Sequence, residues 1–255
     1  MSDILAQIVA RTRARIANEP PDRDAAERVA KSRVPFAFST ALQRDGVNVI
    51  AEIKSASPSA GSIVPNPDVE SIANEYRNGG AAAISIVTEP DFFCGSREWI
   101  ARAKTTGLPV IMKDFVVECS QLMNGIAAGA DAILLLASLL DGHRIREFIS
   151  LLDAYGCDAL VEVHDDGELD RAIEGGARLI GVNNRNLRDF SVDLATSETL
   201  AKRMPDGVIR IAESGIKTRS DVDRLRAAGF NAFLVGESLL RQTDRAAAVA
   251  ELVKR

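Results

Sequence analysis

Short hydrophobic runs alternate with longer amphipathic segments over most of the chain. The runs have the length and β-branched content of buried strands, and the segments between them carry apolar residues at helical spacing. The runs are Val47–Ile53, Ala82–Val87, Pro109–Met112, Ala132–Ala137, Ala159–Val163, Leu179–Val182, Val208–Ala212 and Ala232–Val235. The helical segments lie near 68–78, 96–104, 118–128, 141–155, 166–174, 194–203, 218–228 and 244–254. Eight strand–helix units predict an α/β fold of the (β/α)8 TIM-barrel type, and an open doubly wound sheet is the alternative.

Glycines mark the ends of several helical segments. Gly-Gly-Ala at 79–81, Gly-Ala-Asp at 129–131, Gly-Gly-Ala at 175–177 and Gly-Phe-Asn at 229–231 each directly precede a hydrophobic run. Glycine accepts the left-handed backbone that stops a helix. These short connections are expected at the amino-terminal face of the barrel, which leaves the longer polar loops for the opposite face.

The first 46 residues stand outside the repeat. Residues 3–17 have the spacing of an amphipathic helix, and residues 18–46 are expected to be an irregular lead-in. Residues 1–255 are therefore expected to form a single domain, with the barrel over 47–255 and an N-terminal helical extension over 1–46.

Composition and charge limit the classes of protein to which the chain can belong. A net charge of −5 argues against a nucleic-acid binder, and the longest apolar run is too short to span a membrane. Cys94, Cys119 and Cys157 are scattered, which indicates neither a disulfide framework nor a zinc site. We expect a cytoplasmic protein, a monomer or a weak homodimer, with Cys157 as a small buried apolar residue.

Polar and charged residues end most of the predicted strands, where a buried sheet is normally apolar. In a barrel of this type the strand ends share one rim, which is where catalytic residues lie. The residues are Glu52, Lys54, Lys113, Asp114, Glu162, Asn183, Asn184, Arg185, Glu213 and Glu237. A single one would fit a structural ion pair, but delivery of so many to one rim indicates an active site.

These residue types suit acid–base chemistry. A lysine that is desolvated or lies beside other cations has a lowered pKa and acts as a general acid near neutrality. A glutamate in the same water-poor pocket is expected to have a raised pKa and to exchange protons. Asparagine and arginine orient a polar or carboxylated substrate.

The ends of the seventh and eighth strands resemble a phosphate site. Ser214, Gly215, Gly236 and the backbone of Glu237 offer small residues and open N–H groups, and Ser57 after the first strand adds a donor. His143 and His164 have no metal-ligand partner at useful spacing, so a surface or capping role is expected for both. The sequence has no Walker loop, dinucleotide fingerprint or HExxH motif, and it therefore favours chemistry without a cofactor or a metal.

The strand-end residues fall inside longer sequence motifs. These are AEIKSASPSAG (51–61), TEPDFFCGS (88–96), MKDF (112–115), EVH (162–164), GVNNRNL (181–187), AESGI (212–216) and FLVGES (233–238). Together and in this order they resemble the indole-3-glycerol-phosphate synthase family over nearly the whole chain. Ser55 and Ala60 depart from the family pattern, which often has a basic residue there.

The resemblance implies a lyase (a carboxy-lyase) of tryptophan biosynthesis, an aromatic amino acid pathway. Its substrate is 1-(2-carboxyphenylamino)-1-deoxyribulose 5-phosphate, and its products are indole-3-glycerol phosphate, carbon dioxide and water. The resemblance makes Lys113 the general acid for ring closure and Glu162 the partner in dehydration. Lys54 holds the substrate carboxylate or acts as a second acid, and Glu52 orients both lysines. The N-terminal extension caps the substrate mouth.

The resemblance also implies the binding residues. Asn183, Arg185 and Glu213 contact polar groups of the substrate, while Phe93, Phe115, Leu134 and Leu187 form an apolar slot for its ring. Ser57, Ser214, Gly215, Gly236 and Glu237 hold the phosphate. Two other classes remain open: an aldolase-like barrel that forms a Schiff base on Lys113 or Lys54, and a phosphate-binding barrel without catalysis.

Overall fold

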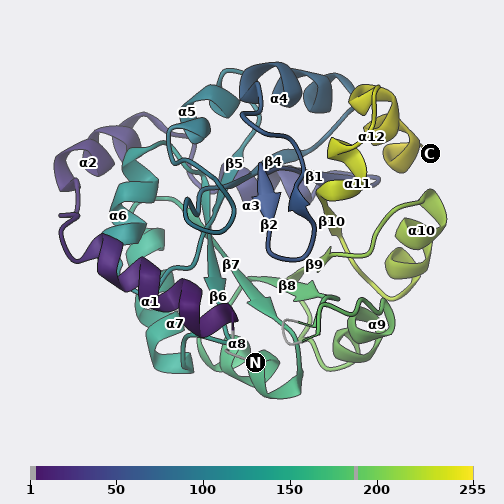
Figure 1. The fold of residues 1–255 in the computed structure, drawn as a ribbon. Helices are drawn as coiled ribbons and strands as arrows, with labels where there is room; N and C mark the ends of the chain where they lie inside the picture. Colours follow the sequence, from purple (N-terminus) through teal and green to yellow (C-terminus); the bar gives the residue numbers. More distant parts are fainter. Residues whose placement is uncertain (1–3, 187–188, 255) are drawn as a thin grey trace.

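A closed barrel of eight parallel strands forms the centre of the molecule (Figure 1). The computed structural model describes residues 4–186 and 189–254. The barrel strands are β1 (Asn48–Ile53), β4 (Ala83–Val87), β5 (Val110–Lys113), β6 (Ala132–Leu136), β7 (Asp158–Val163), β8 (Leu179–Asn183), β9 (Ile209–Glu213) and β10 (Ala232–Val235). Strand β1 pairs with both β4 and β10, which closes the ring and confirms the predicted (β/α)8 fold.

Helices surround the barrel in Figure 1 and connect successive strands. They are α4 (Val69–Asn78), α5 (Trp99–Lys104), α6 (Cys119–Ala127), α7 (Gly142–Ala154), α8 (Asp166–Glu174), α9 (Ala195–Ala201), α10 (Arg219–Ala227) and α12 (Arg245–Val253). Two small elements were not predicted: the hairpin of β2 (Ala56–Ser57) with β3 (Gly61–Ser62), and the one-turn helix α11 (Glu237–Leu240). Both lie in loops that follow strand ends, and therefore on the rim that bears the site.

The predicted glycine stops have left-handed backbones. Gly80, Gly129, Gly176 and Gly229 have φ of 94°, 98°, 79° and 92°. A side chain at these positions would strain the turn. The connections that follow are short, so each helix is tied closely to the start of the next strand.

The lead-in over residues 18–46 was predicted to be irregular, and that prediction was wrong. It contains α2 (Arg23–Ser32) and α3 (Ala37–Leu42), which follow the predicted first helix α1 (Ile4–Ile16). The side chain of Asp22 caps α2 by accepting a hydrogen bond from the Ala25 N–H. An aspartate before an alanine-rich segment was the available signal for this helix.

Helix α3 lies at the amino-terminal ends of the strands. Phe38 and Leu42 are fully buried in the apolar cluster that fills the barrel interior. The Ser39 N–H donates to Asp158, the first residue of β7, at 2.9 Å. This end of the barrel is therefore closed by protein, and the opposite end is left for a ligand.

The three cysteines are free, and Cys157 is buried as expected. Trp99 packs against the outer core. Within the described residues, no helix is both long enough and apolar enough to cross a membrane.

Candidate active site

A cavity of about 780 Å³ opens at the carboxyl ends of the barrel strands. Side chains from β1, β4, β5, β6, β7, β8, β9 and β10 and from the loops after them line it. Asn184 ends its strand but does not line the cavity, whereas all described residues that were given a catalytic or binding role do. Leu187, the remaining one, lies outside the described residues.

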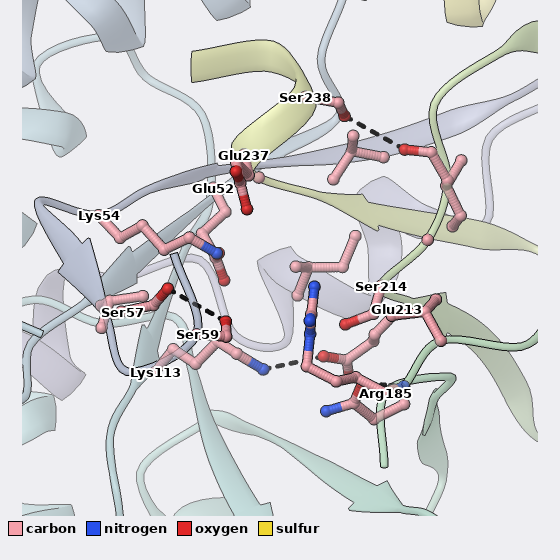
Figure 2. A pocket seen from close by; sticks show the side chains of 18 of the residues that line it. Glu52, Lys54, Ser57, Ser59, Lys113, Arg185, Glu213, Ser214, Glu237 and Ser238 are labelled. Carbon is pink, nitrogen blue, oxygen red and sulfur yellow. Dashed lines mark hydrogen bonds and ion pairs between the residues drawn. The ribbon is translucent and has the colours of Figure 1, made fainter. Parts of the chain in front are cut away.

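Lys113 lies at the centre of a charged cluster (Figure 2). Its Nζ is 2.8 Å from Oε2 of Glu162 and 2.8 Å from Oε2 of Glu213. Lys54 forms a separate pair, with its Nζ 2.6 Å from Oε1 of Glu52. The three glutamates are nearly inaccessible to solvent, so the interactions act in a region of low polarity.

The pKa of Lys113 is raised, whereas the sequence predicted that it would be lowered. Burial lowers it, but the carboxylates of Glu162, Glu213 and Glu52 outweigh burial and raise the pKa well above that of a free lysine. The sequence did not reveal that the neighbours of this lysine are anions. Lys113 is therefore a charged ammonium and a hydrogen-bond donor when no ligand is bound.

The three carboxylates differ from one another. Burial favours the protonated form of each, yet Lys54 and Lys113 lower the pKa of Glu52, and Lys113 and His164 lower that of Glu162. Only the pKa of Glu213 shifts in the expected direction. Burial raises it to about 7; the negative charge of Glu162 also raises it, and Lys113 only partly opposes the two. The site thus holds two ionised carboxylates and one that changes charge near neutrality.

Two buried carboxylate oxygens of the cluster have no hydrogen-bond partner among the described residues. They are Oε2 of Glu52 and Oε1 of Glu213. Glycines make room for both side chains. A Cβ at Gly181 would lie 2.2 Å from Oε1 of Glu213, and one at Gly236 would lie 2.5 Å from Oε1 of Glu52. A buried acceptor without a donor is costly, and this cost adds to the burial that favours protonation of these carboxylates.

Asn183 and Arg185 extend the cluster from β8. The Asn183 amide donates to Oε1 of Glu162 at 2.9 Å, and its side-chain oxygen accepts from the Arg185 N–H at 3.0 Å. The Arg185 guanidinium donates to the Phe190 carbonyl at 3.2 Å and lines the cavity. Asn183 therefore holds Glu162 from the side opposite to Lys113.

An apolar wall faces the charged cluster. The rings of Phe93 and Phe115 have centroids 5.9 Å apart and planes tilted by 40°, and Leu134 lies on the barrel floor. Helix α1 adds apolar residues that sequence reasoning missed: Ile4, Leu5 and Ile8. Their helical periodicity was visible, but nothing local indicated which part of the barrel they would meet.

The predicted phosphate residues lie at the same cavity. Ser214 and Gly215 have consecutive left-handed backbones, with φ of 66° and 80°, and Gly236 precedes α11. Ser57 is held in β2, where its hydroxyl accepts from the Ala60 N–H at 3.1 Å. Lys217 and Arg241 also line this part of the cavity and were not predicted.

His164 was expected to have a surface or capping role, and the structure corrects this. Its side chain is only 13% exposed, and its Nε2 lies 3.3 Å from Oε1 of Glu162. Residues two apart in a strand share a face, so the spacing of 162 and 164 was the available signal for this contact, although β7 ends at Val163. His143, in contrast, is exposed at the start of α7.

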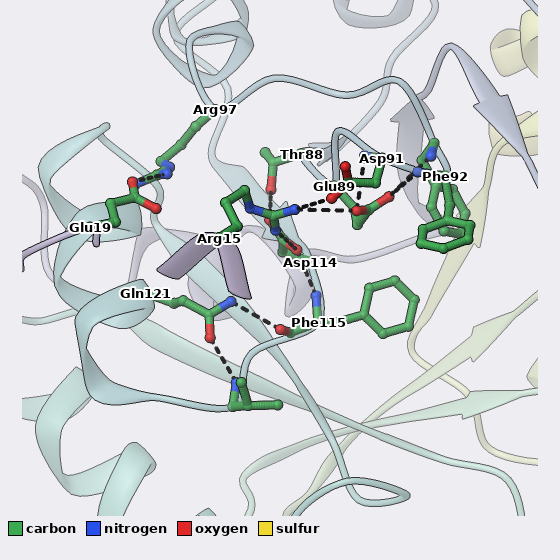
Figure 3. A network of polar contacts seen from close by, with 12 residues as sticks. Arg15, Glu19, Thr88, Glu89, Asp91, Phe92, Arg97, Asp114, Phe115 and Gln121 are labelled. Carbon is green, nitrogen blue, oxygen red and sulfur yellow. Dashed lines mark hydrogen bonds and ion pairs between the residues drawn. The ribbon is translucent and has the colours of Figure 1, made fainter. Parts of the chain in front are cut away.

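Arg15 joins α1 to two loops of the rim (Figure 3). Its guanidinium lies 2.8 Å from Asp91, 3.4 Å from Glu89 and 3.8 Å from Asp114. Glu89 in turn accepts the N–H of Phe93 at 3.1 Å, and Asp114 adjoins Lys113. One residue of the N-terminal helix therefore contacts the loops that carry the apolar wall and the central lysine.

Among residues 4–186 and 189–254, no cluster of three or more histidine, cysteine, aspartate and glutamate side chains is arranged to hold a metal ion. A (β/α)8 barrel with acid–base residues at the strand ends and small residues after β9 and β10 defines the class of barrel enzymes that act on phosphorylated small molecules. A family profile described as indole-3-glycerol phosphate synthase matches residues 5–252. The chain belongs to this family.

Curated relatives agree over nearly the full length. The chain is 44% identical to the indole-3-glycerol phosphate synthase of Chlorobium chlorochromatii over 91% of both chains. It is 41% identical to that of Ruminiclostridium cellulolyticum over 98% of both chains. Among solved structures, the tryptophan synthase α subunit of Legionella pneumophila matches with a TM-score of 0.63 at 12% identity, covering 87% of this chain and 98% of that one. The last similarity supports the barrel fold alone.

Proposed function

We propose that this protein is an indole-3-glycerol-phosphate synthase, a carboxy-lyase of tryptophan biosynthesis. It converts 1-(2-carboxyphenylamino)-1-deoxyribulose 5-phosphate into indole-3-glycerol phosphate, carbon dioxide and water. The observation that carries the proposal is the position of Lys113, held between Glu162 and Glu213 at the floor of a cavity with an apolar wall. The reaction is redox-neutral as written, so it requires no oxidant or reductant.

Ring closure needs a proton donor at the ribulose carbonyl. The anthranilate ring attacks this carbonyl carbon, and the oxygen becomes a hydroxyl if an acid protonates it as the bond forms. The raised pKa of Lys113 keeps it protonated for this step. Carbon dioxide then leaves, and the electron pair of the broken carbon–carbon bond returns to the ring system.

Dehydration needs a base and an acid on one intermediate. Glu162 is ionised, lies 2.8 Å from the Lys113 ammonium and accepts the proton that the intermediate loses. Lys54 binds the substrate carboxylate in the first step or supplies a second acid in this one, and Glu52 fixes its position at 2.6 Å. Pairing to a single carboxylate leaves Lys54 with donors for either task.

Substrate binding divides between the two sides of the cavity. Phe93, Phe115 and Leu134 contact the anthranilate ring, Asn183 and Arg185 its polar groups, and Glu213 a ribulose hydroxyl. Ser57, Ser214, Gly215, Gly236 and the Glu237 N–H bind the phosphate. The left-handed backbone at residues 214 and 215 supports this assignment, because it directs successive N–H groups to one side.

The chain acts as a single barrel domain in the cytoplasm, as a monomer or a weak homodimer. Within the N-terminal extension, α1 is the part that caps the substrate mouth. Ile4, Leu5 and Ile8 at the cavity support this role, whereas α3 lies at the opposite end of the barrel.

The purified protein should form indoleglycerol phosphate from the carboxyphenylamino-deoxyribulose phosphate without added metal or cofactor, as followed by the fluorescence of the product. Borohydride treatment with substrate is the accompanying control. No covalent adduct is expected. An adduct on Lys113 or Lys54 would instead support a Schiff-base enzyme, and binding without turnover would support the non-catalytic barrel.

Replacement of Arg15 by glutamine should raise KM severalfold with a smaller change in kcat. The substitution removes the ion pairs to Asp91, Glu89 and Asp114, so α1 is held less firmly over the apolar wall. Arg11→Gln on the exposed face of the same helix is the matched control and should leave KM unchanged. Equal KM values for the two variants would contradict the capping role of α1.

A further inference from the structure

Glu168 holds His164 in one orientation. Its Oε2 accepts the His164 backbone N–H at 2.9 Å and lies 2.9 Å from the ring Nδ1. Glu168 is itself fixed in the first turn of α8, where its N–H donates to the Asp165 cap at 2.9 Å. The ring therefore cannot turn without breaking contacts on both sides of the β7–α8 connection.

The other ring nitrogen faces the active site. Nε2 is buried and lies 3.3 Å from Oε1 of Glu162, and it makes no hydrogen bond within the described part of the chain. Asn183 donates to the same oxygen, and Lys113 donates to the other one. Glu162 is thus approached by donors from β5, β8 and the end of β7.

The ring lies between two carboxylates, one at each nitrogen. A neutral imidazole carries one N–H and can donate to only one of them, whereas an imidazolium donates to both. The surrounding charges support the charged form. Lys113 is shared between Glu162 and Glu213, and His164 lies between Glu162 and Glu168, so a charged imidazole adds a cation that faces two carboxylates.

We propose that His164 is a positioning residue of the active site, held by Glu168 as an imidazolium that orients Glu162 and keeps it ionised for proton transfer. The inference deepens the proposed function and rests on it for the role of Glu162. Burial opposes protonation of His164, but Glu162 and Glu168 outweigh burial and raise its pKa to about 10, which agrees with this geometry. The other charged groups near the pair are Arg171 on α8, 3.9 Å from Glu168, and Lys113, Glu213 and Glu52 around Glu162.

The first test needs no catalysis. The chain has two histidines, so their imidazole resonances can be assigned with His143→Gln. In the wild-type protein the His164 resonance should stay in its protonated position through pH 8, and Glu162→Gln should move its midpoint down by at least one pH unit. A His164 midpoint near the ordinary value of about 6.5 that Glu162→Gln leaves unchanged would overturn the proposal.

The second test is the pH dependence of kcat. His164→Gln keeps a hydrogen-bond donor but removes the charge, so the pKa of Glu162 should rise. Because Glu162 acts as a base, the acidic limb should move to higher pH by about one unit. At neutral pH Glu162 stays ionised in both proteins, so the pH shift does not lower kcat there; the lost orientation of Glu162 should lower kcat about tenfold with KM nearly unchanged. His143→Gln should match the wild type. An unshifted limb in a folded His164→Gln variant would mean that the histidine only packs.

The two tests separate the possible failures. If the wild type lacks synthase activity, the proposed function fails while the NMR titration still decides whether His164 is locked as a cation beside Glu162. If activity is present and the titration shows no link to Glu162, the proposed function stands and the role of His164 fails. Loss of fold in His164→Gln is detected by circular dichroism, and His164→Asn then provides the second uncharged variant.

Discussion

Replacing Lys113 with methionine is expected to lower kcat by about a thousandfold or more. General acid catalysis typically contributes ~10²–10⁴-fold to a rate. Methionine keeps much of the length and volume of the lysine but cannot donate a proton. The substrate should still bind, because the apolar wall and the phosphate residues are untouched, so KM should change little. Steady-state kinetics with product fluorescence measure both constants.

The variant has a specific structural risk and a matched control. Without the ammonium, Glu162 and Glu213 lose a partner, so Glu213 is expected to take up a proton and relieve the repulsion. Lys104→Met is the control, because its Nζ also pairs with a largely buried carboxylate, Asp131, at 2.6 Å, away from the cavity. It should retain full kcat. A change in KM alone for Lys113→Met would contradict the assignment of Lys113 as the acid.

Glu162→Gln is expected to lower kcat by about 10²–10⁴-fold and to leave the barrel folded. The amide has the same shape and can still accept from Asn183, but it cannot take the proton released during dehydration. Lys113 retains Glu213 as a partner, so no isolated charge is created in the interior. Ring closure should be less affected than dehydration, and rapid-quench analysis should therefore reveal an accumulated decarboxylated intermediate.

Glu198→Gln serves as the control for this variant. Glu198 also forms an arginine ion pair, with Arg224 at 2.7 Å, but at the surface on α9. It should change neither kcat nor the pH profile. Unimpaired turnover by Glu162→Gln would assign the base to another group, of which Glu213 is the best placed, with a pKa of about 7.

The barrel itself was readable from the sequence because it is built from local signals repeated along the chain. Each strand is a short buried run, each crossover a helix-period segment, and each return a glycine stop such as Gly80 or Gly129. Once the ring closes, topology alone gathers the strand ends at one rim. For that reason Glu52, Lys113, Glu162 and Glu213 could be placed in one site without knowledge of any distance.

The partners of these residues required the tertiary structure. Whether a lysine meets cations or anions depends on side chains from other strands, so the direction of the Lys113 pKa shift could not be read locally. The contact of His164 with Glu162 depends on the backbone path after β7 and on Glu168. The same holds for Arg15, whose three carboxylates lie 74 or more residues away along the chain. Local periodicity determines which elements form, whereas the charge balance of a buried site is a sum over residues that only folding brings together.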